Sequence, residues 1–491
     1  MKVRSVGALA ALSMLLTSYS VWSLAGDGAP RRETVTQFRE RGVEQPSERL
    51  PGGAGSFVMT GTLRAEGRLG HARLAADSES ETFVLVNVRG DDQATGRAAR
   101  RHLAIVVDRS GSMAGKRLRN AISAAQGAVR RLGNQDMVSV IDYSGSARVL
   151  VPPTELDPRS RERIVNELGR LVADGDTCIS CGLETSLELL SRRSGFVNRV
   201  LLVSDGEATS GVRDIDGMRS VASRVRSANA TVSTIGVDVD YNERMMAAIA
   251  NEANGRHYFV ESPEGLSRIF DEELSGLERA VARNAELELD LAPGVELLDV
   301  ADRSFLREGS RVVVSLGSFA AGEERSVLAR VRVPRGASGE RAIVTTRLAY
   351  DDLATGNAAR SESRLVAFLS EDGTRGPLDP IVEERVQRSG TVTALNDANG
   401  LFESGNAQEA RRRVDEKLGE VRSSRSAAIA AAPAARKAEV SNEFDRQEAA
   451  LGAASTAFAA PPPSPSSSFE DQRKSKVALK RNQAEAFELS R

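Results

Sequence analysis

The chain has 491 residues, which is too long for one ordinary hydrophobic core, so two or more domains are expected. Its formal net charge is −2 and only 4% of its residues are aromatic. Neither a basic surface nor a set of base-stacking side chains is therefore expected, and nucleic acid is excluded as a partner.

The N-terminus has the order of a secretory signal peptide. Two basic residues precede an apolar stretch over residues 6–16, and Ser23-Leu24-Ala25 provides small residues before a cleavage point. We predict a signal peptide over residues 1–25 and an exported protein, in the periplasm, the cell envelope or the extracellular space. An uncleaved membrane anchor is the alternative, because residues 6–25 are just long enough to span a bilayer. Only in that case is a membrane contact expected.

The first segments after the signal peptide differ in pattern. Residues 26–53 are rich in Arg, Glu, Gly and Pro without periodicity, which predicts a linker. Residues 54–98 contain two strand-like stretches, at 60–63 and 82–88, and are predicted to be a β segment.

Residues 102–280 alternate between two patterns. Continuous apolar runs, typical of strands that are buried on both faces of a parallel sheet, occur at 103–107, 137–142, 200–203 and 232–237. Apolar residues with helical spacing occur at 118–132, 161–171, 183–190, 212–225 and 243–250. This alternation predicts an α/β fold with a doubly wound, mainly parallel sheet.

Short strands are predicted again over residues 284–370, where their spacing indicates a β-sandwich-like domain. The strand-like stretches within 57–89 are expected to complete this sandwich, which would make the α/β domain an insertion. Residues 376–424 have helical character. Residues 425–491 are predicted to be a low-complexity and charged tail that contains a Pro- and Ser-rich spacer and, over 470–491, a charged segment that could form a transient helix.

The residues that carry the most chemistry follow the first buried strand. Asp108, Ser110 and Ser112 stand at alternate positions where a strand ends and a helix is expected to begin, and Gly111 lets the backbone turn between the two serines. Ligands bind at this carboxyl edge of open α/β sheets. One carboxylate and two hydroxyl groups are oxygen donors of the kind that a hard divalent cation requires. The alternative is that these side chains only cap the following helix.

Two further segments favour the metal interpretation. Thr177 lies in a loop before a predicted helix, and Asp205 follows another buried strand. Both are expected at the same sheet edge as Asp108, and they add a hydroxyl and a carboxylate. Helix capping is again the alternative for each of them. Three separate segments that converge on one edge predict a cation site formed by Asp108, Ser110, Ser112, Thr177 and Asp205, with Mg²⁺ preferred and Mn²⁺ or Ca²⁺ as alternatives.

Residues from His102 to about Leu277 resemble a von Willebrand factor type A domain. The five candidate ligands match the metal-ion-dependent adhesion site of that family, and Ala104–Met113, Thr234–Asn242 and Ile249–Gly255 resemble its other conserved segments. More weakly, the whole chain resembles exported bacterial proteins with such a domain between β segments.

This resemblance implies how the site works. Ser110 and Ser112 would ligate Mg²⁺ directly, with Thr177 as a further direct ligand, whereas Asp108 and Asp205 would act mainly through water. Neutral ligands leave the cation electrophilic, so that it accepts an acidic side chain from a protein partner. In the family, such capture can be coupled to movement of the last helix, here residues 263–279.

The loop around Thr177 departs from the family pattern. Asp176 and Cys178 stand where the family commonly has Gly and Asn. Asp176 could add negative charge near the cation or simply face solvent as a turn residue. Cys178 and Cys181 are too few for structural zinc, but in an exported chain they could form a short-loop disulfide that stiffens this loop. A redox Cys-x-x-Cys pair is the alternative, although no thioredoxin-like context surrounds it.

An enzyme is not expected. His71, His102 and His257 are far apart in the sequence, and none adjoins a nucleophile motif. The predicted function is metal-dependent protein–protein binding, in adhesion or complex assembly. The alternative is a structural or assembly protein of the cell envelope that docks without metal.

Overall fold

The computed structural model describes residues 43–44, 47–48, 55–94, 100–191, 195–205, 207–238, 241–260, 264–459 and 468–490. All of them belong to one compact unit, Arg41–Arg491. The predicted signal peptide and most of the predicted linker lie outside the described residues. Among the helices that are described, none is long and apolar enough to cross a membrane.

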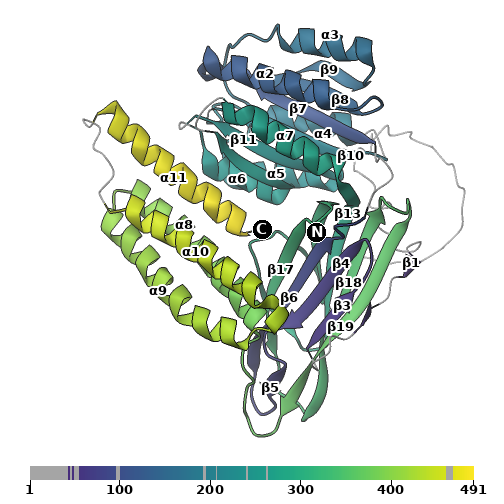
Figure 1. Cartoon of the computed structure of the whole chain (residues 1–491), viewed down its shortest axis with the longest axis vertical. Helices are drawn as coiled ribbons and strands as arrows, with labels where there is room; N and C mark the ends of the chain where they lie inside the picture. Colours follow the sequence, from purple (N-terminus) through teal and green to yellow (C-terminus); the bar gives the residue numbers. More distant parts are fainter. Residues whose placement is uncertain are drawn as a thin grey trace, which may run out of the picture. The chain divides into compact units, whose positions relative to one another are not determined.

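A six-stranded sheet forms the centre of the α/β part (Figure 1). In spatial order its strands are β12 (Asn254–Val260), β11 (Ala230–Val237), β10 (Val197–Ser204), β7 (Arg101–Asp108), β8 (Met137–Tyr143) and β9 (Ala147–Glu155). Neighbouring strands are parallel except β8 and β9, which are antiparallel. β9 was not predicted, because Pro152 and Pro153 are unfavourable inside a sheet. Here β9 is an edge strand, and both prolines fall where its register with β8 shifts.

Helices cover both faces of this sheet, so the prediction of a doubly wound α/β fold is confirmed. Alternate residues of β7 enter two separate cores, with Leu103 and Ile105 in one and Ala104 and Val106 in the other. The first core is completed by α2 (Lys116–Arg131), α3 (Pro158–Leu168) and α7 (Glu264–Glu278), and the second by α4 (Ile179–Ser191), α5 (Ile215–Ser227) and α6 (Glu243–Glu252).

Two mainly antiparallel sheets pack around a third core as a β-sandwich. One sheet contains β1 (Val43–Glu44), β19 (Ala358–Ser370), β18 (Gly339–Asp352), β13 (Ala280–Leu291), β16 (Arg311–Ala320) and β15 (Leu306–Glu308), with β5 (Arg73–Ala75) also on β19. The other contains β14 (Glu296–Ala301), β17 (Glu324–Val333), β6 (Ser80–Gly90), β4 (Leu63–Leu69), β3 (Ser56–Met59) and β2 (Ser47–Glu48). β17 pairs with β6 along its whole length, so strands from before and after the α/β part share one sheet, as expected for an insertion.

The helices that follow the sandwich are α8 (Pro380–Glu403), α9 (Ala407–Ala431), α10 (Lys437–Ala457) and α11 (Phe469–Ser490), with a 3-10 turn η2 (Ala434–Arg436) before α10. The prediction of a low-complexity and charged tail over 425–491 is wrong for the described part of that range. Leu451 and Ala454 of α10 and Ala486 and Leu489 of α11 are buried in one core with α8 and α9. Alanine, whose small side chain gives a weak apolar pattern in the sequence, provides several of these buried residues.

Candidate metal centre

The loop after β7 holds the first three candidate ligands. Asp108 is completely buried, and its carboxylate accepts hydrogen bonds from the backbone N–H of Ser110 at 2.8 Å and from the Ser204 hydroxyl at 2.6 Å. A short 3-10 turn, η1 (Gly111–Met113), follows Ser110. The carboxylate of Asp108 is therefore held within the sheet edge by the ends of two neighbouring strands, β7 and β10.

The alternative of helix capping is not supported for these residues. Helix α2 begins after Gly115, which provides no side-chain cap, and the Ser110 side chain does not cap η1. In this part of the molecule, the side chains that accept hydrogen bonds at helix starts are instead Asp157 for α3, Asp214 for α5 and Asn242 for α6. Asp108, Ser110 and Asp205 are thus available for another role.

Hydroxyl and carboxylate groups from two loops meet at this edge. The hydroxyl oxygens of Ser110 and Ser112 are 3.0 Å apart, and the Ser112 hydroxyl donates to Oδ1 of Asp205 at 2.8 Å. Ser110 and Asp205 are buried, whereas Ser112 is exposed. The group therefore has a buried base and one hydroxyl that is open to solvent.

The loop that carries Thr177 is bound to the same edge by backbone hydrogen bonds. The carbonyl of Gly175 accepts from the N–H of Gly111 at 3.0 Å, and the N–H of Cys178 donates to the carbonyl of Ser144, after β8, at 2.7 Å. Thr177 itself is buried, and its N–H donates to the Thr209 hydroxyl at 2.9 Å. We refer to Asp108, Ser110, Ser112, Thr177 and Asp205 as the oxygen cluster.

The two residues at which this loop departs from the family pattern lie in different environments. Asp176 is exposed to solvent. Cys178 and Cys181 form a disulfide with a Cα–Cα distance of 5.3 Å, at the start of α4. Gly211 packs against it with a φ of +70°, and a Cβ at this position would stand 2.5 Å from the sulfur of Cys178. The disulfide therefore links the Thr177 loop covalently to α4, and the backbone at Gly211 packs closely against it.

Arg117, on the first turn of α2, was missed by the sequence reasoning. Its Nη1 donates to Oδ2 of Asp205 at 2.7 Å and to the backbone carbonyl of Ser112 at 3.0 Å. Its Nε and Nη2 donate to the carboxylate of Asp238 at 3.1 and 2.6 Å. No local pattern marks it, since an arginine on a helix is usually a solvated surface residue.

The electrostatics of the oxygen cluster favour a cation. The pKa of Asp108 is raised to about 6, mainly because burial disfavours its charged form and also because Asp205 is nearby, although hydrogen bonds from Ser204 and Ser110 oppose the rise. Burial likewise raises the pKa of Asp205, against the hydrogen bonds from Ser112 and Arg117. Two buried carboxylates that destabilise each other are stabilised by positive charge between them.

The donor set fits a hard divalent cation. Within the described residues, no group of three or more His, Cys, Asp or Glu side chains is arranged to hold a metal. The oxygen cluster instead combines two carboxylates with three hydroxyls, all oxygen donors of the kind that Mg²⁺ binds together with water. The five residues of the oxygen cluster therefore remain the candidate ligands of a cation.

The three histidines do not contribute to this site. All are buried: His71 contacts Thr82 in the sandwich, and His102 lies 3.1 Å from the Ser139 hydroxyl. The Nδ1 of His257 is 2.9 Å from the hydroxyl of Thr234. They are packing residues of three different strands or turns.

Comparison with known proteins agrees with this architecture. A family model described as "von Willebrand factor type A domain" matches residues 102–272. The protein sll0103 of Synechocystis sp. is 27% identical over 293 residues, which cover 57% of this chain and 68% of that protein. YfbK of Escherichia coli is 26% identical over 220 residues, which cover 44% of this chain and 38% of YfbK, so the chain spans well under half of that relative. A solved structure, "von Willebrand factor type A from Catenulispora acidiphila", matches with a TM-score of 0.64 and 18% sequence identity. The match covers 82% of this chain and 91% of that chain, so the two are similar in fold.

Proposed function

We propose that this chain, in which residues 102–272 form a von Willebrand factor type A domain, is a non-enzymatic binding protein that captures an acidic side chain of a protein partner through a divalent cation. The observation that carries the proposal is the arrangement of the oxygen cluster. Buried Asp108 and Asp205 lie beneath exposed Ser112, within one hydrogen-bonded group at the carboxyl edge of the sheet.

Each residue of the oxygen cluster has a definable role. Mg²⁺, when bound, would supply an electrophilic coordination position for a carboxylate oxygen from outside the protein. Ser110, Ser112 and Thr177 offer neutral oxygens, so they bind a cation without cancelling its charge. Asp108 is held in place by hydrogen bonds from the Ser204 hydroxyl and from the backbone of Ser110, and it would act on the cation mainly through water.

Arg117 limits how strongly Asp205 can neutralise a bound cation. Because one oxygen of Asp205 accepts a hydrogen bond from Arg117, part of the charge of this carboxylate is already compensated. A bound cation would therefore keep more of its own charge than if Asp205 were unpaired, which favours an anionic partner group. We also propose that the protein acts outside the cytoplasm, on the basis of the signal-peptide pattern at residues 1–25.

Calorimetric titration of the full chain with Mg²⁺ alone tests the first step. Wild type should bind, and Ser112→Ala should weaken binding by roughly tenfold or more, since it removes an exposed ligand from an otherwise intact loop. Ser78→Ala is the matched control, because Ser78 is an exposed serine of the sandwich. Equal affinities of the two variants would contradict the proposed site.

Affinity capture from envelope extracts tests the second step. Partners should be retained in Mg²⁺ and released by EDTA, and carbodiimide amidation of the carboxyl groups in the extract should abolish capture. Identical partner lists with Mg²⁺ and with EDTA would defeat metal-bridged recognition and would favour a docking protein of the envelope that works without metal.

A further inference from the structure

The C-terminal helix α11 is seated on the α/β part by a buried lysine. Lys480 is only 8% exposed, and its ammonium group donates to the backbone carbonyl of Tyr241 at 2.6 Å and to the carboxylate of Glu243. The same ammonium lies 4.6 Å from the centroid of the Tyr241 ring. A lysine is rarely buried without such partners, so these contacts define where α11 docks.

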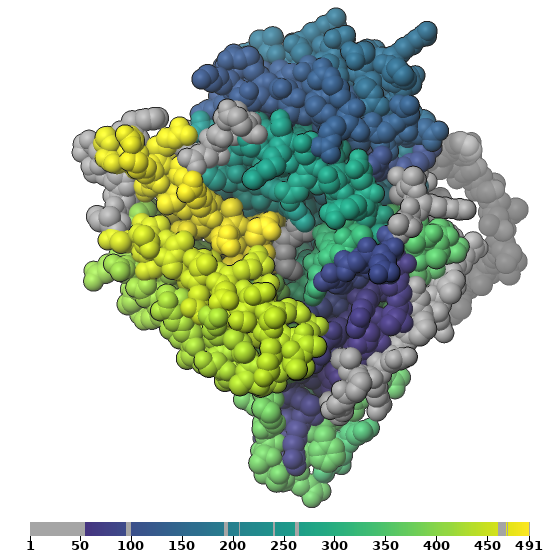
Figure 2. Space-filling view, viewed as in Figure 1, coloured from purple at the N-terminus to yellow at the C-terminus, as the bar shows by residue number. Residues whose placement is uncertain are grey.

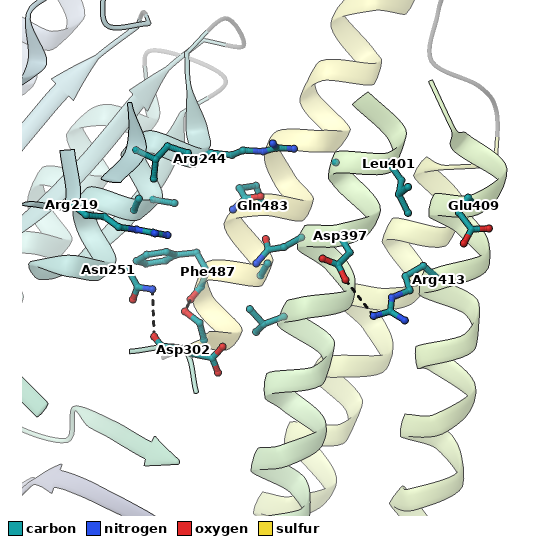
Figure 3. Close-up of a pocket in the computed structure, with 18 of the residues that line it drawn as sticks. Arg219, Arg244, Asn251, Asp302, Asp397, Leu401, Glu409, Arg413, Gln483 and Phe487 are labelled. Carbon is teal, nitrogen blue, oxygen red and sulfur yellow. Dashed lines mark hydrogen bonds and ion pairs between the residues drawn. The ribbon is translucent and has the colours of Figure 1, made fainter. Parts of the chain in front are cut away.

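A second contact lies further along α11. Phe487 packs edge-on against His257 with ring centroids 6.0 Å apart, and it clusters with Ala247 and Ala250 of α6. Figure 3 shows Phe487 pointing from α11 toward the part of the α/β domain that carries Asn251. In Figure 2 the yellow end of the chain lies between the teal α/β surface and the yellow-green helices.

An open cleft lies beside the surface on which α11 docks. It has a volume of about 860 Å³ and is lined by α6 on one side, by α8 and α9 on the other, and by α11 residues that include Gln483 and Phe487 (Figure 3). This space flanks the helix, so α11 is not enclosed by protein on that side.

Asp238 connects the neighbourhood of Tyr241 to the oxygen cluster through Arg117. Asp238, directly after β11, has a φ of +68°, which is unusual for a residue other than glycine. Its N–H donates to the carbonyl of Val260 at 3.0 Å, and its carboxylate accepts from Arg117. Only two residues separate Asp238 from Tyr241 in the chain. A backbone held in a sparsely populated conformation persists where its surroundings enforce it.

We propose that docking of α11 and cation binding at the oxygen cluster are energetically coupled, with Arg117 as the connecting residue. The chain of contacts runs from Lys480 to Tyr241, whose ring stacks on that of Phe259 in β12 with the centroids 6.0 Å apart. Val260, the next residue of β12, accepts a hydrogen bond from the N–H of Asp238. Asp238 accepts from Arg117, which also donates to Asp205. The inference rests on the proposed function, because it concerns the regulation of the same site.

The direction of the coupling follows from how the guanidinium of Arg117 is shared. With α11 docked, Arg117 points Nε and Nη2 at Asp238 and only Nη1 at Asp205. When α11 undocks, the position of the Asp238 carboxylate is less restrained, and Arg117 turns to form a bidentate ion pair with Asp205. A cation then competes with a stronger ion pair. Docked α11 therefore favours cation binding, and by reciprocity a bound cation favours docked α11.

Mg²⁺ titration of full-chain variants measures this coupling. Lys480→Ala and Phe487→Ala loosen α11 at two separate contacts, and each should raise the Kd for Mg²⁺ on the order of fivefold or more. Lys474→Ala is the matched control, because Lys474 lies on the same helix, is largely exposed and pairs only locally with Glu470 in the part of the chain described here. Its Kd should equal that of wild type.

A double-mutant cycle tests the connecting residue. Arg117→Gln should lower the Kd for Mg²⁺, because it removes a positive charge beside Asp205. In that background, Lys480→Ala should have no further effect. Hydrogen exchange of residues 469–490 is the reciprocal readout: it should be slower in Mg²⁺ than in EDTA for wild type, and insensitive to Mg²⁺ for Ser112→Ala.

The possible failures are distinguishable. Faster exchange of α11 in Lys480→Ala with an unchanged Kd for Mg²⁺ would refute the coupling and leave the proposed function intact. An effect of Lys480→Ala that persists in the Arg117→Gln background would remove Arg117 as the connection. An effect of Lys480→Ala without one of Phe487→Ala would indicate a local charge effect rather than docking. A wild type that does not bind Mg²⁺ would refute both the proposed function and the coupling.

Discussion

Helix α7 is anchored to the central sheet by a buried carboxylate. Glu273 is 2% exposed and accepts hydrogen bonds from the hydroxyls of Ser233 and Tyr258, each at 2.8 Å, and it forms an ion pair with Arg199. Burial by itself would raise the pKa of Glu273, but these partners lower it, so the carboxylate is charged in the folded protein. Glu273→Gln removes that charge and leaves the Arg199 guanidinium, 11% exposed, without its counterion.

Breaking a buried ion pair in this way is expected to lower the free energy of unfolding by about 3–5 kcal/mol. Glu272→Gln is the control: Glu272 is the preceding residue of α7, and its half-exposed carboxylate pairs with Arg256 near the surface. That change should cost less than about 1 kcal/mol. Urea unfolding followed by far-UV circular dichroism gives both values, and hydrogen exchange shows whether the loss is centred on α7. Losses that agree within about 0.5 kcal/mol would refute the conclusion that burial determines the strength of this anchor.

Three further outcomes are expected. The pKa of His257 is lowered to about 3 because the ring is buried, so the stability that its neutral form contributes is complete above pH 6.5 and is lost as the pH falls toward 3. The free energy of unfolding, measured with urea, should therefore fall by about 2 kcal/mol between pH 7 and 5, and this loss should be absent in His257→Gln. Replacing Cys178 and Cys181 with serine should weaken Mg²⁺ binding in calorimetry. The thermal midpoint should stay nearly unchanged, because the disulfide closes a loop of very few residues. An unchanged Kd would show that the disulfide does not hold the loop that carries Thr177. Gly211→Ala should lower the thermal midpoint more than Gly309→Ala. Both residues have a positive φ, but only at Gly211 would the added Cβ meet other atoms. Equal shifts would mean that backbone strain alone is responsible.

Much of the fold could be predicted because its signals are local. The continuous apolar run at 103–107 identifies a strand that is buried on both faces, and the spacing of residues 118–132 identifies a helix with one apolar face. The errors have equally local reasons. β9 contains two prolines, which are unfavourable inside a sheet. α10 and α11 bury few large apolar side chains among many small and charged residues, so their helical pattern is weak in the sequence.

The candidate ligands were also accessible from the sequence, because three of them share one tight turn. Asp108, Ser110 and Ser112 lie within five consecutive residues, and the ends of parallel strands lie at one edge of a sheet wherever such strands occur. Residue type and position in the chain therefore sufficed to place Asp205 beside them.

The charges around those ligands were decided only by the tertiary structure. Arg117 pairs with Asp205 across 88 positions of the sequence and with Asp238 across 121, and Lys480 meets Glu243 across 237. The individual residues give no sign of these contacts, because a charged side chain on a helix is as compatible with solvent as with a distant carboxylate. The chain alone thus specifies which oxygen donors follow the buried strands, whereas packing between distant segments specifies which positive charges stand beside them.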